Sequence, residues 1–298
     1  MRKKQKHYLS IIIILILCIT IGYAYLSSTL NGEITTVNIY PVTRKCQRAK
    51  TLHTETCSSS STTGYCQKAG YTSSGSKKTT TITYGSLGSS GTLTVGDAFD
   101  CDVNGDGIFN DATERFYYVG SLSTNTTKVV LIYYNNVNAG VAGINNVYYG
   151  TSMNTLTGPV TAKSQLPTTS QWPKVSLNST TRAIKNKAGT TVISSFSYSG
   201  YSARFITYQE LKSACNTSGI ESDGTLDSKC TFLFENSNFH GGTTNGEGFW
   251  LENQESGNPA YGYRVYVYTR AVQQIPTAQV VGATVKPVIE VSKSSILY

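Results

Sequence analysis

Charged residues are scarce in this 298-residue chain: Asp, Glu, Lys and Arg make up 14% of it, whereas it holds 21 Tyr and 27 Gly and is rich in Ser, Thr and Asn. This composition favours an exported, β-rich protein over a cytosolic helical enzyme. The formal net charge is +8, but Arg2, Lys3, Lys4 and Lys6 supply four of these charges and leave +4 on the rest. The basic balance therefore indicates membrane topology, and we expect no nucleic-acid partner.

Histidine is rarer still, since the chain has three. His53 and His240 are the two that follow the N-terminal apolar segment, so a Ser/His/Asp hydrolase would have to use one of them. His240 lies in the sequence NFHGG, which is typical of a surface loop. We therefore expect no catalytic residues and predict that the protein is not an enzyme.

A long apolar run occurs directly after the basic N-terminus, from Ile11 to Ile21. Its length is near the lower limit for spanning a bilayer. Residues 1–27 are therefore either a signal peptide, with a possible cleavage site after Ala24, or a single-pass membrane anchor. The positive-inside rule places the basic end in the cytoplasm and the residues after about 27 outside. We expect an extracytoplasmic protein that is anchored at the cell surface or secreted.

The cysteines favour disulfide bonds. Cys18 lies in the apolar run and six others follow it, an even number, which in an exported chain is typical of disulfides and allows fifteen pairings. Cys215 and Cys230 bracket a short polar loop, so we predict that they pair. The others would then stabilise the poorly hydrophobic region before residue 100: Cys46, Cys57, Cys66 and Cys101. A zinc site is the weaker alternative, because no spacing resembles C-x-x-C and His53 is the only imidazole nearby.

Composition divides the exported part at about residue 95. Residues 28–95 are rich in Ser, Thr, Gly and Lys, which predicts a small disulfide-tied β module or a stalk. Residues 96–298 are expected to form one larger domain. In this domain, residues 115–119 and 128–134 have strand-like sequences with a polar turn between them, which predicts a hairpin.

Other elements of the larger domain follow from local patterns. Residues 140–174 read mostly as loop, with Trp172 as an anchor. We expect a short helix at 177–187 and a strand at 195–199. Thr207 followed by Glu210 matches a capping box, which predicts a helix over 207–215. Pro287 in the closing strand, 285–291, indicates an edge or a bulge.

A calcium-loop pattern begins at residue 102. The sequence DVNGDG matches D-x-[DN]-x-D-G, in which oxygen ligands at alternate positions meet one hard cation and Gly allows the sharp turn. We expect a structural calcium ion with these ligands: Asp102, Asn104, Asp106 and Asp111. The closing acid of an EF-hand would fall at Thr113, so Asp111 or Glu114 would have to replace it. The alternative is an Asp/Asn/Gly turn without a metal.

A recognition surface is predicted in the stretch 246–291. Residues 249–251 (FWL) look buried, and after a polar loop at 252–259 comes a strand of strict alternation. One face would pack on the core with Tyr263, Val265, Val267 and Thr269. The other would be exposed and carry Arg264, Tyr266, Tyr268 and Arg270. Tyr and Arg are enriched at recognition hot spots, although both are also ordinary on a half-exposed strand.

Three motifs in order, ARFITYQELKSAC (203–215), GFWLEN (248–253) and TVKPVIEVSKS (284–294), resemble the C-type-lectin-like fold of the formylglycine-generating-enzyme type. That family includes bacterial and phage surface proteins whose ligand-binding C-terminus is diversified by retroelements. The resemblance implies an α+β, β-rich domain with a small twisted antiparallel sheet, few helices and long loops. Thr284 and Lys286 stand where the family has Gly and Arg. The ligand-binding positions that the resemblance implies are Trp250, Glu252, Asn253, Asn258, Tyr261, Tyr263, Arg264, Tyr266, Tyr268 and Arg270.

Together these features predict a non-catalytic, adhesin-like ligand-binding protein of the bacterial cell surface. A structural fibre or pilus subunit is one alternative, because residues 21–40 are similar to the leader and first strand of surface and matrix-fibre proteins of Gram-positive bacteria, although no prepilin cleavage pattern is visible. A formylglycine-generating enzyme is another, but it would need late copper-holding cysteines and none follows Cys230. The triplets of calcium-dependent sugar sites are missing, so the expected ligand is an extracellular protein or a glycan.

Overall fold

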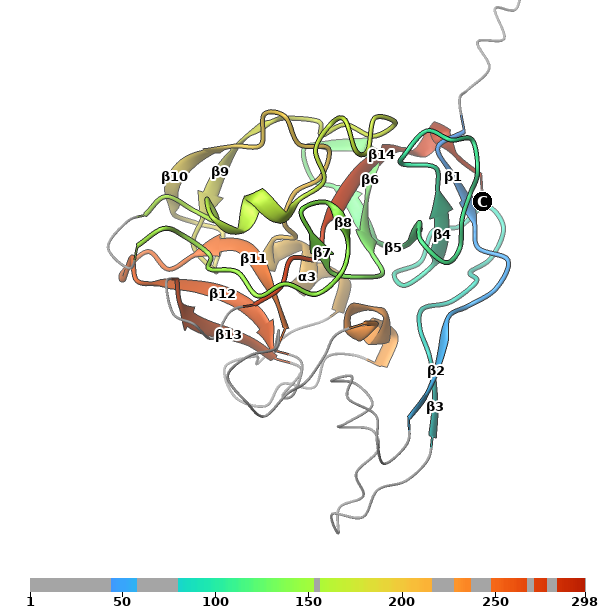
Figure 1. Ribbon diagram of the computed structural model, residues 1–298, viewed down its shortest axis with the longest axis horizontal. Coiled ribbons are helices and arrows are strands. Elements are labelled where there is room, and N and C mark those ends of the chain that lie inside the picture. The colour runs from blue at the N-terminus through green and yellow to red at the C-terminus, as the bar shows by residue number, and fades with distance from the viewer. Residues whose placement is uncertain are drawn as a thin grey trace, which may run out of the picture. The chain divides into compact units, whose positions relative to one another are not determined.

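The computed structural model describes residues 44–57, 80–152, 156–215, 228–236, 248–266, 271–277 and 283–297 (Figure 1). All of them belong to one compact unit, Arg44–Tyr298. The predicted leader at 1–27 lies outside the described residues. No helix in the described ranges is long and apolar enough to cross a membrane.

A six-stranded sheet forms the largest element. Its strand order is β14 (Val288–Ser292), β6 (Asn125–Tyr133), β5 (Arg115–Leu122), β4 (Ala98–Cys101), β1 (Cys46–Arg48) and β15 (Ile296–Leu297). The pairs are antiparallel except for β1 and β15, which run parallel. The predicted hairpin is confirmed as β5 and β6, whose apolar halves are buried between neighbouring strands. The closing strand starts after Pro287 and lies at the edge of the sheet, where a residue without an N–H is tolerated.

A three-stranded sheet, β11 (Gly248–Gln254), β12 (Tyr261–Tyr266) and β13 (Ala271–Pro276), carries most of the predicted ligand face. Every residue of β11 is buried, which confirms the buried Phe-Trp-Leu segment. The prediction that one face of β12 is exposed is wrong at Arg264, which is only 5% exposed. Tyr149 packs on the same face at Gly262, where an added Cβ would lie 3.0 Å from the Tyr149 ring. The alternating sequence of β12 therefore belongs to a strand whose central residues are buried on both faces.

The remaining strands form small hairpins. These are β2 (Thr54–Cys57) with β3 (Thr80–Thr83), β7 (Val137–Asn138) with β8 (Val141–Ala142), and β9 (Thr181–Lys185) with β10 (Val192–Ser197). The short helix predicted at 177–187 is wrong, because β9 pairs with β10 and buries Ile184 between exposed neighbours. The strand predicted at 195–199 is confirmed in part by β10.

The described residues contain one α-helix, α3 (Tyr208–Cys215), and three 3₁₀ segments: η1 (Ala162–Gln165), η2 (Ser228–Phe234) and η3 (Lys293–Ser295). The helix begins with the predicted capping box. The Glu210 N–H donates to Thr207 Oγ1 at 3.1 Å, and the Thr207 N–H donates to the Glu210 carboxylate at 2.9 Å. The predicted disulfide between Cys215 and Cys230 is present and joins the end of α3 to η2. The fold is thus α+β and β-rich.

The described part of 28–95 is joined to the main sheet. Strand β1 lies between β4 and β15, and a disulfide links Cys46 on β1 to Cys101 on β4. The described residues between 44 and 95 therefore pack with the residues that follow, in the unit Arg44–Tyr298. Cys66 lies outside the described residues.

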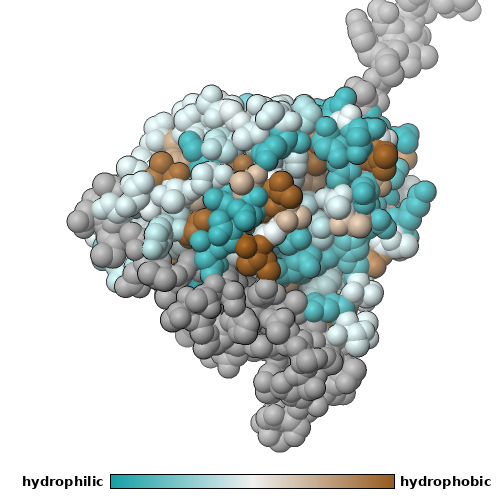
Figure 2. Space-filling view, in the orientation of Figure 1, coloured by the Kyte–Doolittle hydropathy of each residue, from teal (hydrophilic) through white to brown (hydrophobic). Residues whose placement is uncertain are grey.

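A continuous hydrophobic core connects the sheets. Trp172 anchors the long 140–174 segment as predicted, with its ring 5.6 Å from Phe116 and 5.3 Å from Tyr133. On the face shown in Figure 2, hydrophilic side chains predominate and the hydrophobic ones form small, separate patches.

Candidate functional site

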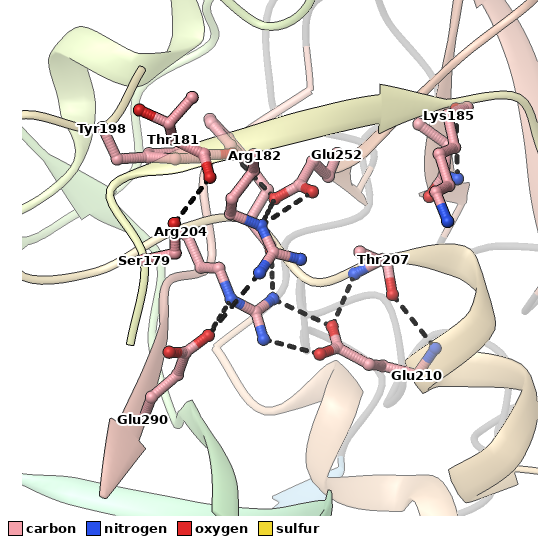
Figure 3. A network of polar contacts seen from close by, with 12 residues as sticks. Ser179, Thr181, Arg182, Lys185, Tyr198, Arg204, Thr207, Glu210, Glu252 and Glu290 are labelled. Carbon is pink, nitrogen blue, oxygen red and sulfur yellow. Dashed lines mark hydrogen bonds and ion pairs between the residues drawn. The ribbon is translucent and has the colours of Figure 1, made fainter. Parts of the chain in front are cut away.

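Two arginines and three glutamates from distant parts of the sequence meet in one buried network (Figure 3). Arg182 lies on β9, Arg204 precedes α3, Glu210 lies on α3, Glu252 on β11 and Glu290 on β14. Backbone pairing sets this up, because Arg204 and Val288 exchange N–H···O bonds of 3.1 and 2.9 Å, which brings Glu290 two residues further along β14 close to Arg204. Four elements (β9, α3, β11 and β14) and the segment before α3 therefore meet at this network.

Each charge in the network has a partner. Arg204 donates to Glu290 at 2.6 Å through Nε, and to Glu210 at 2.9 and 2.5 Å through its two Nη atoms. Arg182 Nε donates to both Glu252 oxygens at 3.0 Å, and Nη1 lies 3.7 Å from Glu290. The Tyr198 hydroxyl also donates to Glu252, at 3.0 Å. Bidentate guanidinium–carboxylate pairs of this kind fix geometry as well as charge.

Burial and ion pairing shift the pKa of each of these groups in opposite directions. Burial by itself would lower the pKa of Arg204, but Glu210 and Glu290 outweigh it and hold that pKa well above its ordinary value. Burial by itself would raise the pKa of Glu210, but Arg204 outweighs it and lowers that pKa. For Glu252 burial dominates over Arg182 and Arg204, and its pKa is raised. Burial of Glu252 is therefore less compensated by its guanidinium partners than burial of Glu210.

A pocket of about 590 Å³ lies against this network. It is bounded by the turn between β5 and β6, by β9, by α3 and by β11. Its volume falls in the range of small-molecule sites. The side chains that line it are mostly hydroxyls, amides and charged groups: Ser121, Ser123, Thr124, Asn178, Ser179, Thr181, Arg182, Lys185, Thr207, Gln209, Glu210, Ser213, Glu252 and Asn253.

The predicted ligand residues separate into groups. Glu252 and Asn253 line the pocket but are 2% exposed, and Asn253 also bonds the Tyr208 N–H at 2.6 Å. Trp250 is fully buried and donates its indole N–H to the Val147 carbonyl at 2.8 Å. These three positions are therefore buried in the described structure. The other predicted positions lie as follows: Tyr263 and Arg264 are buried, Tyr261 and Tyr266 half-buried, Asn258 exposed, and Tyr268 and Arg270 outside the described residues.

The predicted calcium loop is held by its own side chains. Asp102, Asn104 and Asp106 each accept a loop N–H at 2.7–2.9 Å, and Gly105 and Gly107 have φ of 84° and 82°. The buried Glu114 carboxylate accepts the N–H groups of Val103 and Asn110 at 3.2 Å. Asp111 instead accepts a bond from the Thr51 hydroxyl at 3.4 Å. Within the described ranges no three acidic, His or Cys side chains form a metal-binding group.

His53 takes part in a second buried cluster. Its Nδ1 lies 2.5 Å from Glu235, its Nε2 lies 2.8 Å from the Asp111 carbonyl, and Tyr117 donates to Glu235 at 2.5 Å. Both ring nitrogens of His53 are thus engaged by groups other than a serine, which leaves it outside a hydrolase arrangement. His240 lies outside the described residues.

The sequence interpretation missed Arg182, Arg204 and Glu290 as site residues. A signal was present, because Arg204 and Glu290 each interrupt an apolar run, ARFI and VIEV, in a chain with few charges. A charge at such a position is buried only when it is paired.

Comparison with known proteins adds no family to this description. A scan against protein-family models found no match. Searches among curated proteins and among solved structures likewise found none.

Proposed function

We propose that this protein is a non-catalytic, extracytoplasmic ligand-binding protein and that the pocket beside the Arg/Glu network is its binding site. The observation that carries the proposal is the combination of a pocket of about 590 Å³ with a wall of side chains already fixed by internal bonds. A site of this kind binds without reorganising, which lowers the entropic cost of association. Its carboxylates are engaged by guanidinium, N–H or hydroxyl groups, so they serve as structure rather than as bases.

The cellular setting of the proposal comes from the sequence. The basic and apolar N-terminus supports either a cell-surface protein with a single-pass anchor or a secreted protein. The two disulfides in the described residues agree with an oxidising compartment. We place the chain among C-type-lectin-like binders, on the motif order of 203–294 and on the proximity of the domain's ends, β1 and β15. In this proposal Glu252 and Asn253 contribute to the ligand site from the pocket wall.

We further propose that the loop at 102–114 binds a structural calcium ion. Asp102, Asn104, Asp106 and Glu114 supply hard oxygen donors on one short loop, which suits this cation. The ion would supply positive charge among three carboxylates and would stabilise the connection between β4 and β5.

The binding proposal is tested by filling the pocket. Ser213 is an exposed pocket residue on α3, and Lys212 is its exposed neighbour outside the pocket. Ser213→Trp should abolish binding to cell-surface glycans and extracellular proteins presented on arrays. Lys212→Trp should retain it, and both variants should melt within a few degrees of the wild type. Equal binding by both variants would contradict the proposed site, and detergent-resistant ladders from cell-wall extracts would favour the fibre alternative.

A further inference from the structure

The charge that the pocket leaves available to a ligand is positive. The Glu210 carboxylate is occupied by two bonds from Arg204 and one from the Thr207 N–H. Glu252 is occupied by Arg182 and the Tyr198 hydroxyl. Glu290 behind them accepts bonds from Arg204 and from the Asn178 N–H at 2.6 Å. These negative groups therefore have little capacity left for a ligand cation.

Lys185 is the contrasting case. It lines the pocket from β9, it is exposed, and its ammonium makes no hydrogen bond or ion pair within the described residues. Arg182 lines the same pocket, but its Nε donates to Glu252, its Nη1 lies 3.7 Å from Glu290, and 20% of its side chain is exposed. The Lys185 ammonium, with three donors, suits an anionic ligand group.

The rest of the wall suits a ligand rich in hydroxyl groups. Ser121, Ser123 and Thr124 come from the β5–β6 turn, and Ser179 and Gln209 come from the flank of β9 and from α3. These groups donate and accept hydrogen bonds in turn, as sugar hydroxyls do. No aromatic residue lines the pocket in the described part of the chain, so stacking of a flat nucleobase has no support there.

We propose that the pocket binds a polyhydroxylated carboxylate of one or two sugar rings, such as a uronic acid, with Lys185 holding its carboxylate. This inference rests on the proposed binding function and names the ligand class. The network itself carries three carboxylates against two guanidiniums. Among the described residues that line the pocket, Lys185 is the cation outside this network, so its removal should affect an acidic ligand most.

The test compares three sugars that differ in charge at one ring size: galacturonic acid, galactose and galactosamine. Dissociation constants are measured by calorimetry with the full chain, for the wild type, Lys185→Met and Lys212→Met. We expect the wild type to bind galacturonic acid at least about tenfold more tightly than galactose, because hydrogen bonds to charged groups are stronger than those between neutral groups. Lys185→Met should remove this preference without changing the melting temperature, and Lys212→Met should keep it.

Digalacturonic acid distinguishes the two sources of such a ligand. Tighter binding than the monomer indicates a polysaccharide, and equal binding indicates a free sugar acid. Equal affinity for the acid and for galactose, preference for galactosamine, binding of none of the sugars, or an unchanged preference in Lys185→Met would overturn the ligand class. The proposed function is judged separately, because Ser213→Trp would still remove binding of another ligand on the arrays.

Discussion

At the scale of single residues, Arg204 is the group on which the buried network depends. It is fully buried and pairs with both Glu210 and Glu290. Arg204→Leu would leave two carboxylates without their guanidinium, and removing one partner of a buried ion pair costs about 3–5 kcal/mol. We expect urea unfolding to show a loss of this size. Arg44→Leu, at an exposed arginine, should change stability by less than about 0.5 kcal/mol, and equal effects of the two substitutions would contradict the role given to Arg204.

Lys286 makes stability depend on pH. Its ammonium is buried and donates to the carbonyl oxygens of Tyr134, Leu233 and Glu235 at 3.1, 3.1 and 2.8 Å. Burial lowers its pKa from 10.5 to about 7, with the charge of Glu235 opposing the shift. Between these two values the unfolded chain binds more protons than the folded one, so this lysine makes the free energy of unfolding rise with pH, by at most about 1.4 kcal/mol per pH unit.

The measurement for Lys286 is urea unfolding of the wild type and Lys286→Met between pH 6 and pH 10. The difference in unfolding free energy between the two should grow in favour of the wild type as pH increases above about 7. Parallel pH profiles would show that Lys286 keeps an ordinary pKa in the fold.

At the scale of elements, the loop between β4 and β5 is either a calcium site or a turn without a metal, and chelation can tell the two apart. If it binds calcium weakly, as secreted modules do, chelation should lower the melting temperature by about 2–4 °C in a domain of this size. Asp106→Ala should remove the sensitivity to chelator. Asp111→Ala should keep it, because the Asp111 carboxylate bonds Thr51 instead of the loop. Melting that is unaffected by chelator in the wild type would refute the metal.

Local patterns predicted some elements well and others poorly. The capping box was predicted correctly because its two hydrogen bonds join Thr207 and Glu210, which are three residues apart in the sequence. Residues 177–187 were predicted as helix, but strand pairing between β9 and β10 decided otherwise. The packing of Tyr149 against Gly262, more than a hundred residues away in the sequence, is a contact that no local pattern contains.

At the scale of the whole molecule, the N-terminal limit of the folded unit can be tested by shortening the chain. A chain that begins at Arg44 keeps β1 between β4 and β15 and should unfold in one cooperative transition. A chain that begins at Gly96 loses β1 and the Cys46–Cys101 disulfide, which closes a 55-residue separation and by loop entropy contributes about 4 kcal/mol. We expect the second chain to have a much lower urea midpoint or no transition. Equal midpoints would support the predicted domain boundary near residue 95.

The sequence by itself determined the features that depend on composition and on near neighbours. These are the β-rich α+β class, the β5–β6 hairpin, the helix with its capping box, the disulfide between Cys215 and Cys230, and the burial of residues 249–251. Only the tertiary structure decided which charges meet, because Arg182, Arg204, Glu252 and Glu290 lie on separate elements and are brought together by strand register. The tertiary structure also offered a candidate binding site that the sequence had not indicated, the pocket beside β9 and α3. Burial of both faces of β12 depends on packing against distant residues, which the alternating pattern of one strand does not reveal.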